Sequence, residues 1–470
     1  MPGPTTLGEL QTSGYPDRSV KEELRANLLA RLASGTSLFA DIVGYDDSVV
    51  PSLERALLAG HDVIMLGERG QAKSRLMRHL VDLLDETVPA IEGCEVNDHP
   101  YRPICARCRA LFAECGDRTP VVWIERDRRY AEKLATPDTS VADLIGDVDP
   151  IRVAEGRYLS DELTIHYGLV PRTNRGIVAI NELPDLPERI QVALFNILEE
   201  REIQIRGYTI RLPLDLLLIC SANPEDYTHR GRIVSPLKDR FGSQVRTHYP
   251  ERITDEIAIM DQEATPPPEG VPVTIPAYMK EIVAELASRL RTSPEVNQRS
   301  GVSVRFSIGA MEVLAASALR RAVRAGEPEA IPRVVDLWAA LPALMGRVEF
   351  DTLEEGRELV ILGRALKHAT LDVYRRRVAG DDLSALVAPF EEGLVLSTSD
   401  VTASSDLLAQ FPRRAPADLG RAVSRLGIED AGEAGVASAL ELCLEGLHLT
   451  KRLNKRAGDD GRWTFEATPA

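Results

Sequence analysis

The stretch that decides the fold is DVIMLGERGQAKSRLMRHLVDLL, residues 62–84. A short apolar strand runs into a glycine-containing loop, Gly67 to Ser74, and a helix follows. The loop approaches the pattern G-x-x-x-x-G-K-[ST]. In that pattern backbone N–H groups hold phosphate oxygens, the lysine (Lys73) reaches the β- and γ-phosphates, and the hydroxyl binds Mg²⁺. The positive N-terminal end of the helix adds to the attraction. This order of strand, loop and helix predicts an ATP site.

The loop departs from the pattern at Ala72, which stands where the last glycine is expected. Alanine is the smallest change available, and it is tolerated if φ at this position is negative. Ser74 is assigned to Mg²⁺. The residues predicted to hold the phosphates are Gly67, Gly70, Gln71, Ala72, Lys73 and Ser74.

Two further apolar strands end in polar residues, at Asn181-Glu182 and at Asn223. An ATPase usually places two acids at the end of the first of these strands, one supporting Mg²⁺ and one polarising the attacking water. Asn181 brings no charge to the first position, which puts metal affinity and turnover in question, whereas Glu182 retains the second. Asn223 is suited to orient the lytic water. The alternatives are a strand that simply ends in polar residues and, after Asn223, a plain turn.

Strands that alternate with helices predict a parallel α/β sheet. A proline-rich linker at 265–276 separates this pattern from a helical one. The predicted regions are an N-terminal tail and helix (1–35, with 1–18 flexible), an α/β nucleotide-binding domain (36–264, with a cysteine-rich insertion at 87–118 and a hairpin at 202–212), a helical lid (277–385) and a helical C-terminal region (386–470). In the last region, Ala437–Leu453 is interpreted as a packing helix, with a docking surface as the alternative.

Composition excludes some classes of protein. The chain has 470 residues and a formal charge of −16, from 72 acids and 56 bases. Sequence-independent DNA binding needs a basic face, so nucleic acid is not the expected partner. No apolar run approaches the roughly 20 residues that a bilayer requires. The N-terminus lacks the basic start and apolar stretch of a secretory signal, so we expect a cytoplasmic protein without membrane contact.

Four cysteines gather in the insertion, at Cys94, Cys105, Cys108 and Cys115. In a cytoplasmic chain such bunching indicates metal or redox chemistry before disulfides. Two residues between Cys105 and Cys108 let both sulfurs point at one ion. Four thiolates suit a structural Zn²⁺ or a [4Fe–4S] cluster, with His99 as an alternative ligand. A third interpretation is that the cysteines are reduced and hold no metal.

Five motifs in this order resemble the AAA+ ATPases, and more narrowly the branch of the magnesium-chelatase ATPase subunit and the MoxR proteins. They are GERGQAKSRL, RGIVAINEL, the hairpin EREIQIRGYTIRLP just before LLLICSANPED, LKDRFG, and GVSVRFS. The resemblance covers about residues 40–385. It implies an AAA+ P-loop domain, a parallel sheet flanked by helices, followed by an all-α lid domain.

The resemblance also implies roles for single residues. Asn223 corresponds to the sensor-1 residue. Arg240 corresponds to an arginine finger that enters the site of a neighbouring subunit, and Arg305 to the sensor-2 arginine of the lid. The segment containing Gly44 and Tyr45 corresponds to the one that lines adenine. A finger acting between subunits implies a ring, of six subunits as in the family.

The family's usual partner carries a von Willebrand A-type domain, and its reaction is ATP-driven remodelling or metal insertion. Residues of about 149–164 correspond to its helix-2 insertion. Two other functions remain open. Asn181 and Ala72 suit a scaffold that binds ATP and turns it over slowly. A σ54-type transcription activator needs a GAFTGA-like loop and usually a helix-turn-helix, and the sequence has neither.

Overall fold

The computed structural model describes residues 3–149, 162–199, 202–205, 208–223, 233–297, 300–351, 356–378, 380, 382–411, 417–458 and 461–468. The chain divides into two compact units, Met1–His248 and Tyr249–Ala470. Each unit is described by itself below.

The first unit is built on a five-stranded sheet with the order β11-β1-β10-β7-β4. Every neighbouring pair in it is parallel. The carboxyl ends of all five strands therefore meet at one edge, where ligands of open α/β sheets bind. This is the predicted α/β fold. The strands are β1 (Val63–Leu66), β4 (Tyr130–Leu134), β7 (Gly176–Asn181), β10 (Leu216–Ala222) and β11 (Ser243–Arg246).

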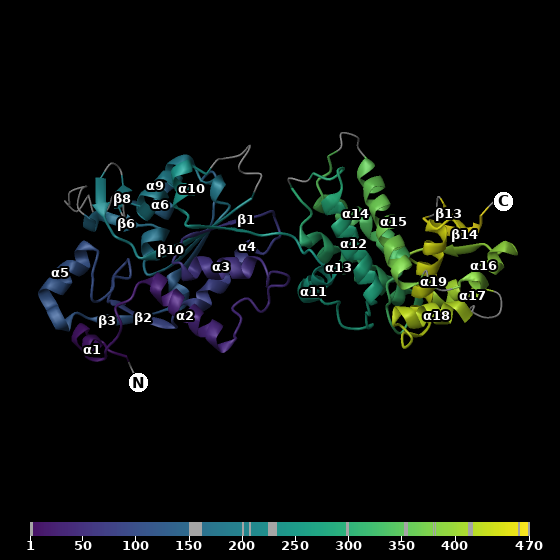
Figure 1. Cartoon of the computed structure of the whole chain (residues 1–470), viewed down its shortest axis with the longest axis horizontal. Helices are drawn as coiled ribbons and strands as arrows, with labels where there is room; N and C mark the ends of the chain where they lie inside the picture. The colour runs from purple at the N-terminus through teal and green to yellow at the C-terminus, as the bar shows by residue number, and fades with distance from the viewer. Residues whose placement is uncertain are drawn as a thin grey trace. The chain divides into compact units, whose positions relative to one another are not determined.

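Helices cover both faces of this sheet because the strands are apolar on both sides. Successive side chains of a strand point to opposite faces. Val63 and Met65 accordingly join the core under one set of helices, and Ile64 and Leu66 join the core under another. The first set is α2 (Val20–Ser34), α3 (Val49–Leu58) and α4 (Lys73–His79), and the second includes α9 (Glu188–Glu199), as Figure 1 shows.

An insertion between α4 and β4 carries the cysteines. Its strands β2 (Thr87–Ile91) and β3 (Val121–Glu125) pair with each other in antiparallel register, and α5 (Ala106–Cys115) lies between them in sequence. β3 therefore belongs to this pair, and β4 supplies the edge strand of the main sheet.

The N-terminal segment packs on this insertion. α1 (Leu7–Thr12) buries Leu7 and Leu10, which lie three positions apart on one helical face. Leu7 N donates to Thr119 O at 3.0 Å, and Val121 N donates to Thr5 O at 2.8 Å. The prediction of a flexible tail at 1–18 is therefore wrong for the described part, because two leucines and two backbone hydrogen bonds hold it.

The remaining elements of the first unit are short. Strands β8 and β9 form an antiparallel hairpin. Strands β5 and β6 pair across the expected helix-2 insertion, most of which lies outside the described residues. The bounds are η1 (Leu80–Leu83), η2 (Gly116–Arg118), η3 (Arg126–Arg129), α6 (Val141–Leu144), β5 (Gly146–Val148), η4 (Glu162–Thr164), β6 (Ile165–Tyr167), α8 (Leu169–Arg172), η5 (Leu183–Asp185), β8 (Glu202–Ile205), β9 (Tyr208–Arg211) and α10 (Ser235–Arg240).

The second unit is mainly helical and shares one hydrophobic core from Met260 to Phe465. It also contains an antiparallel sheet, β12-β14-β13, which the helical expectation for 386–470 omits because its strands have only three to five residues. The elements are α11 (Ile253–Glu263), α12 (Ala277–Thr292), α13 (Val304–Ala325), α14 (Val334–Leu344), η7 (Met345–Arg347), α15 (Arg357–Arg377), α16 (Ser384–Glu391), β12 (Leu396–Thr398), α17 (Ser404–Ala409), α18 (Ala417–Leu426), α19 (Gly432–Leu449), β13 (Leu453–Ala457) and β14 (Trp463–Ala467).

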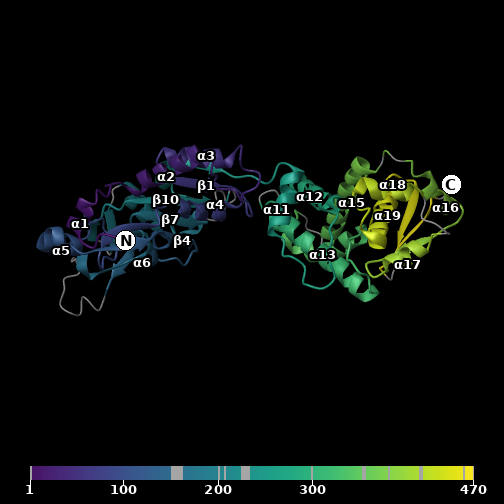
Figure 2. The ribbon, with the colours of Figure 1, turned by 90° about the horizontal axis from the view of Figure 1, so that it is seen from below.

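Helix α19 is the centre of the C-terminal part and packs against α15, α17 and α18 (Figure 2). It is buried along almost its whole length. Its buried acids have partners: Glu441 accepts from Val335 N at 3.0 Å, and Glu445 pairs with Lys455 at 2.6 Å. This agrees with the interpretation of this stretch as a packing helix. Across the described residues, none of the helices combines the length and apolarity needed to cross a bilayer.

Candidate nucleotide site

Three motif-bearing segments meet at the carboxyl edge of the parallel sheet. Because β10 lies between β1 and β7, Asn223 stands between the loop after β1 and the residues after β7. Its Oδ1 accepts from Lys73 Nζ at 2.9 Å, and its Nδ2 donates to Glu182 Oε2. Ser74 Oγ donates to Asn181 Oδ1 at 2.8 Å. The fold thus gathers side chains up to 150 positions apart in sequence.

The loop is held so tightly that its first glycine cannot carry a side chain. A Cβ at Gly67 would lie 1.9 Å from Thr247 Oγ1 and 2.2 Å from Gln71 Oε1. Gln71 Oε1 accepts from Glu68 N at 3.0 Å and from Thr247 Oγ1 at 2.7 Å. Gly70 has a φ of 77°, a conformation that glycine adopts without strain. Gln71 therefore clasps the loop to the segment that follows β11.

Ala72 has a φ of 55° and a ψ of 14°, which is the left-handed conformation. Alanine would be tolerated here if φ were negative, but φ is positive. Helix α4 begins at Lys73, so the chain must turn sharply at Ala72 to enter it. A left-handed residue with a Cβ costs about 1–2 kcal/mol. The missing glycine is therefore a source of local strain.

Lys73 is only 7% exposed, and its ammonium is aimed into the loop. Nζ donates to Gly67 O at 2.5 Å and to Glu68 O at 2.7 Å, in addition to Asn223. An ammonium has three donors and no acceptor. These contacts hold the positive charge at the mouth of the loop, where a phosphate oxygen can exchange with the carbonyl oxygens.

Glu132 joins this network and was not anticipated from the sequence. Its Oε1 accepts from Asn181 Nδ2 at 2.7 Å, and Arg78 donates to both carboxylate oxygens at 2.8 and 2.9 Å. Burial alone would raise the pKa of Glu132, but the hydrogen bonds and charge of Arg78, with bonds from Tyr130 and Asn181, lower it below its ordinary value. An ionised carboxylate thus stands directly behind the neutral Asn181.

Glu182 occupies a strained position immediately after β7. Its φ is 57° and its ψ 49°, unusual for a residue with a long side chain. Its backbone N donates to Ser221 Oγ at 3.2 Å. Non-glycine residues in this conformation cluster at functional sites because the surrounding structure must enforce them. Here the strain turns the carboxylate toward Asn223 and the loop.

The chain is similar to known proteins over part of its length. The family model for the Sigma-54 interaction domain matches residues 155–238, a span that contains β7, α9 and β10. The chain is similar to the magnesium-chelatase subunit ChlI of Nephroselmis olivacea, with 26% identity over 210 residues that cover 43% of this chain and 54% of that protein. A ChlI homologue of Methanocaldococcus jannaschii is 24% identical over 323 residues, covering 64% of this chain and 77% of that protein.

The chain is therefore related to magnesium-chelatase ATPase subunits. It spans about half the length of the first of the two relatives. Among solved structures, a chain of the complex between BchI and BchD of magnesium chelatase aligns at 22% identity over 68% of this chain and 97% of that chain, with a TM-score of 0.34.

In this chain, the segment with Gly44 and Tyr45 is tied directly to the phosphate loop. Tyr45 Oη lies 3.0 Å from Gln71 O and 2.7 Å from His248 O, so its proton is shared between two carbonyls. Burial raises the pKa of the Tyr45 phenol well above its ordinary value. Gly44 has a φ of 81°. The predicted adenine-lining segment thus lies against the loop.

The two predicted arginines lie in different units. Arg240 ends α10, where it forms an ion pair with Glu199 and stacks over the Phe195 ring at 5.6 Å from the ring centre. Both partners belong to α9, and the contacts described for Arg240 do not include the loop. Arg305 is exposed in the first turn of α13, in the second unit.

The cysteine cluster differs from the predicted ligand set. Sγ of Cys94, Cys105 and Cys108 and a carboxylate oxygen of Asp98 lie within 4.8 Å of one another. Cys115 lies seven positions beyond Cys108 on α5, which at 1.5 Å per residue places it about 10 Å along the helix. The assignment of Cys115 to this cluster is therefore wrong, because helix geometry carries it away.

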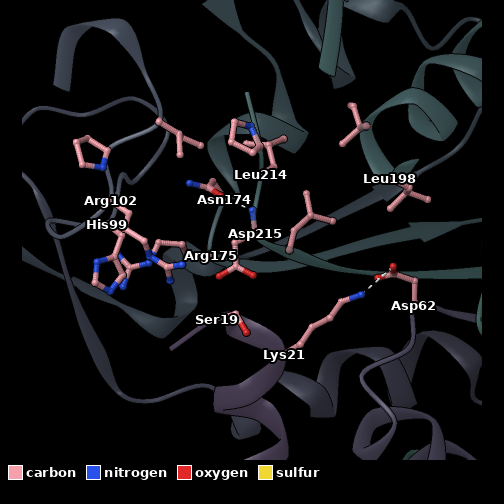
Figure 3. Close-up of a pocket in the computed structure, with 15 residues that line it drawn as sticks. Ser19, Lys21, Asp62, His99, Arg102, Asn174, Arg175, Leu198, Leu214 and Asp215 are labelled. Atoms are coloured by element: carbon pink, nitrogen blue, oxygen red, sulfur yellow. Dashed lines mark hydrogen bonds and ion pairs between the residues drawn. The ribbon is translucent and has the colours of Figure 1, made fainter. Parts of the chain in front are cut away.

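His99 is also outside this group. Its Nδ1 accepts a hydrogen bond from Tyr101 N at 3.1 Å. Its ring lines a separate cavity of about 510 Å³ at the opposite edge of the sheet (Figure 3).

The charged groups of that second cavity are already engaged in holding the fold. Lys21 pairs with Asp62 at 2.9 Å, and Asp62 also accepts from Leu218 N at 2.8 Å. Asp215 accepts from Val20 N at 2.8 Å. These bonds tie α2 to the amino ends of β1 and β10. The cavity therefore reflects how α2 joins the sheet, and we assign it no chemistry.

Proposed function

We propose that this protein binds and hydrolyses ATP with Mg²⁺ at the Gly67–Ser74 loop, in the cytoplasm, as a subunit of a ring. The observation that carries the proposal is the meeting of Lys73 and Ser74 with Asn181, Glu182 and Asn223 at one edge of the sheet. A nucleotide triphosphate is the ligand that needs a buried ammonium, a hydroxyl for Mg²⁺ and a carboxylate for water at one place.

Each side chain has a task in this reaction. Lys73 and the loop N–H groups hold the β- and γ-phosphates, and Lys73 offsets the charge that develops there. Ser74 and Asn181 would hold Mg²⁺, whose positive charge stabilises the phosphate oxygens. Glu132 sits behind Asn181 at 2.7 Å and supplies the negative charge that Asn181 lacks. Glu182 polarises the attacking water and accepts its proton, and Asn223 orients that water.

The arginines complete the site from outside the loop. Arg240 is 40% exposed although it pairs with Glu199 of α9, so a neighbouring subunit can reach its guanidinium. Arginines stabilise the charge of the transition state in phosphoryl transfer. In the proposed ring of six, Arg240 enters the adjacent subunit's site, and Arg305 of the second unit contacts phosphate in its own.

The energy of hydrolysis drives remodelling of a partner protein or metal insertion, as in a magnesium-chelatase-like motor. The relatives are named for magnesium chelatase, and the proposed partner is a protein with a von Willebrand A-type domain. The hairpin of β8 and β9 and the helix-2 insertion are the segments proposed to transmit the change.

A slow-turnover scaffold is the second candidate, and it is favoured by two observations. Ala72 is strained in the left-handed conformation. Asn181 carries no charge of its own. In such a protein, ATP binding would order the ring, and hydrolysis would only reset it.

Phosphate release separates these functions. We expect the purified protein to release phosphate from ATP, and Glu182→Gln to lower the rate by two orders of magnitude or more while ATP still binds. Glu188→Gln is the matched control, because Glu188 is an exposed acid in the first turn of α9. Equal rates for wild type and Glu182→Gln would remove Glu182 from the reaction. If the protein binds ATP without measurable phosphate release, the second candidate function, a slow-turnover scaffold, is the one supported.

A further inference from the structure

The cysteine cluster joins two segments of the insertion that are otherwise separate. Cys94 and Asp98 lie in the loop after β2, whereas Cys105 and Cys108 lie at the start of α5. Cys105, Cys108 and Asp98 are buried, and Cys94 is half-buried. The magnesium-chelatase relationship and the proposed ATP reaction assign nothing to these residues.

The spacing of the sulfurs fits one tetrahedral ion. With zinc–sulfur bonds of about 2.3 Å, the ligands of a tetrahedral site stand about 3.8 Å apart. Cys94 Sγ and Cys105 Sγ are 4.0 Å apart, and all four ligand atoms lie within 4.8 Å of one another. Disulfide bonds require about 2.05 Å, so this spacing is not that of an oxidised pair. All six cysteines are free thiols.

Asp98 gives a second and independent indication of a ligand. Its residue is fully buried, and its Oδ2 accepts from Ile104 N at 3.1 Å and from Cys105 N at 3.0 Å. Its other oxygen, Oδ1, is buried without a hydrogen-bond partner. A buried polar atom left unpaired costs about 1–3 kcal/mol. One hydrogen-bonded oxygen and one open oxygen beside three sulfurs is the arrangement of a monodentate metal-binding carboxylate.

The backbone supports negative charge on the sulfurs. Asp98 N donates to Cys94 Sγ at 3.3 Å, and Cys108 N donates to Cys105 Sγ at 3.3 Å. Cys105 is the N-cap of α5, so the positive end of this ten-residue helix faces the cluster. Metals bind thiolates, not thiols. These contacts favour the form of the cysteines that a metal requires.

We propose that Cys94, Asp98, Cys105 and Cys108 bind one structural Zn²⁺. Three thiolates and a carboxylate are ligands that zinc accepts, and four protein ligands close its coordination sphere. A [4Fe–4S] cluster is disfavoured because each of its ligands binds a different iron, which sets those ligands further apart than the ligands of a single ion.

The zinc has a structural task. It fastens the loop after β2 to α5. This fastened insertion is the surface on which the N-terminal segment packs, where Tyr101 Oη lies 3.2 Å from Leu10 O and 3.1 Å from Tyr15 O. Loss of the ion is therefore expected to loosen α1 as well as α5. The four ligands take no part in the proposed ATP reaction, so the test of the zinc site does not depend on hydrolysis.

The first experiment measures metal in the full-length protein, purified without an affinity tag that binds metal and without chelators. We expect one zinc per chain by elemental analysis. Cys94→Ser, Cys105→Ser and Cys108→Ser should each lose it, and Cys115→Ser, the matched control on the same helix, should keep it. Less than a tenth of a zinc per chain, equal loss in Cys115→Ser, or iron with acid-labile sulfide would overturn the proposal.

A second measurement on the wild-type chain covers the case in which the serine variants fail to fold. Cobalt exchanged for zinc should give the intense visible bands of a tetrahedral ion and a sulfur-to-metal charge-transfer band of three thiolates. Asp98→Ala should shift the visible bands without removing the charge-transfer band. A spectrum of six-coordinate cobalt, or one without thiolate bands, would contradict the ligand set.

Discussion

The phosphate loop and the cysteine cluster lie in the same unit, but they differ in whether their buried polar atoms have hydrogen-bond partners. At the loop, Lys73, Ser74, Asn181 and Asn223 all bond to other groups of the chain. At the cluster, the buried Oδ1 of Asp98 has no hydrogen-bond partner.

The difference teaches how each site deals with its ligand. A site that exchanges its ligand at every turnover gains by satisfying its own polar groups in between, because unpaired buried groups are costly. A site with a permanent ion has no such need. Backbone strain is also distributed differently. At the ATP site positive φ falls on Ala72 and Glu182 as well as on Gly70, whereas at the cluster it falls on Gly93 and Asn97, residue types that tolerate it.

The largest expected effect is on ATP hydrolysis. In the proposed ring the phosphate loop needs Arg240 from a second copy of the chain, whereas the cysteine cluster needs no residue from another copy. If Arg240 acts as the proposed arginine finger, Arg240→Ala should lower the rate of phosphate release by roughly 10³-fold or more. Arg189→Ala, which changes an exposed arginine of α9, should have little effect. The loss of the Arg240–Glu199 pair itself costs little stability because both groups are partly exposed.

Mixing tests whether Arg240 acts between subunits. An equimolar mixture of Arg240→Ala and Lys73→Ala chains should regain activity, because an intact loop of the first can meet an intact arginine of the second. A mixture that stays as inactive as its parts would place Arg240 outside the neighbouring site.

A smaller effect is expected at Glu132, which is proposed to act on Mg²⁺ indirectly, through Asn181. Glu132→Gln should raise the Mg²⁺ concentration needed for half-maximal phosphate release by several-fold, because Glu132 acts only through Asn181. Glu125→Gln, at the exposed end of β3, is the control. The measurement is a Mg²⁺ titration at saturating ATP. An unchanged midpoint would show that Glu132 does not contribute to Mg²⁺ binding.

The smallest effect tests the strain in the loop. Ala72→Gly should stabilise the protein by about 0.5–1 kcal/mol, because relief of the left-handed strain exceeds the entropy that glycine adds to the unfolded chain. Ala59→Gly is matched in chemistry, but Ala59 is exposed and has a φ of −74°, so it should destabilise by about 0.5–1 kcal/mol. Denaturant midpoints compare the two variants, and the same sign for both would contradict the strain.

The sequence predicts the fold and most of the candidate site because strand ends carry recognisable polar residues. Lys73, Glu182 and Asn223 each follow an apolar strand, and parallel strands bring such residues to one edge. Glu132 could not be found in this way, because it lies within an edge strand that follows an insertion of unpredictable length. Asp98 was missed because only the turn of the chain after β2 brings a carboxylate among the sulfurs.

The central claim is that the Gly67–Ser74 loop binds the phosphates of ATP, and equilibrium titration tests it most directly. ATP with Mg²⁺ should bind wild type at one site per chain. Lys73→Ala should weaken binding by about 100-fold or more, since charge-assisted hydrogen bonds contribute about 1.5–3 kcal/mol each. Lys21→Ala, a lysine at the opposite edge of the same sheet, should leave the affinity unchanged. Equal affinity for wild type and Lys73→Ala would contradict the account.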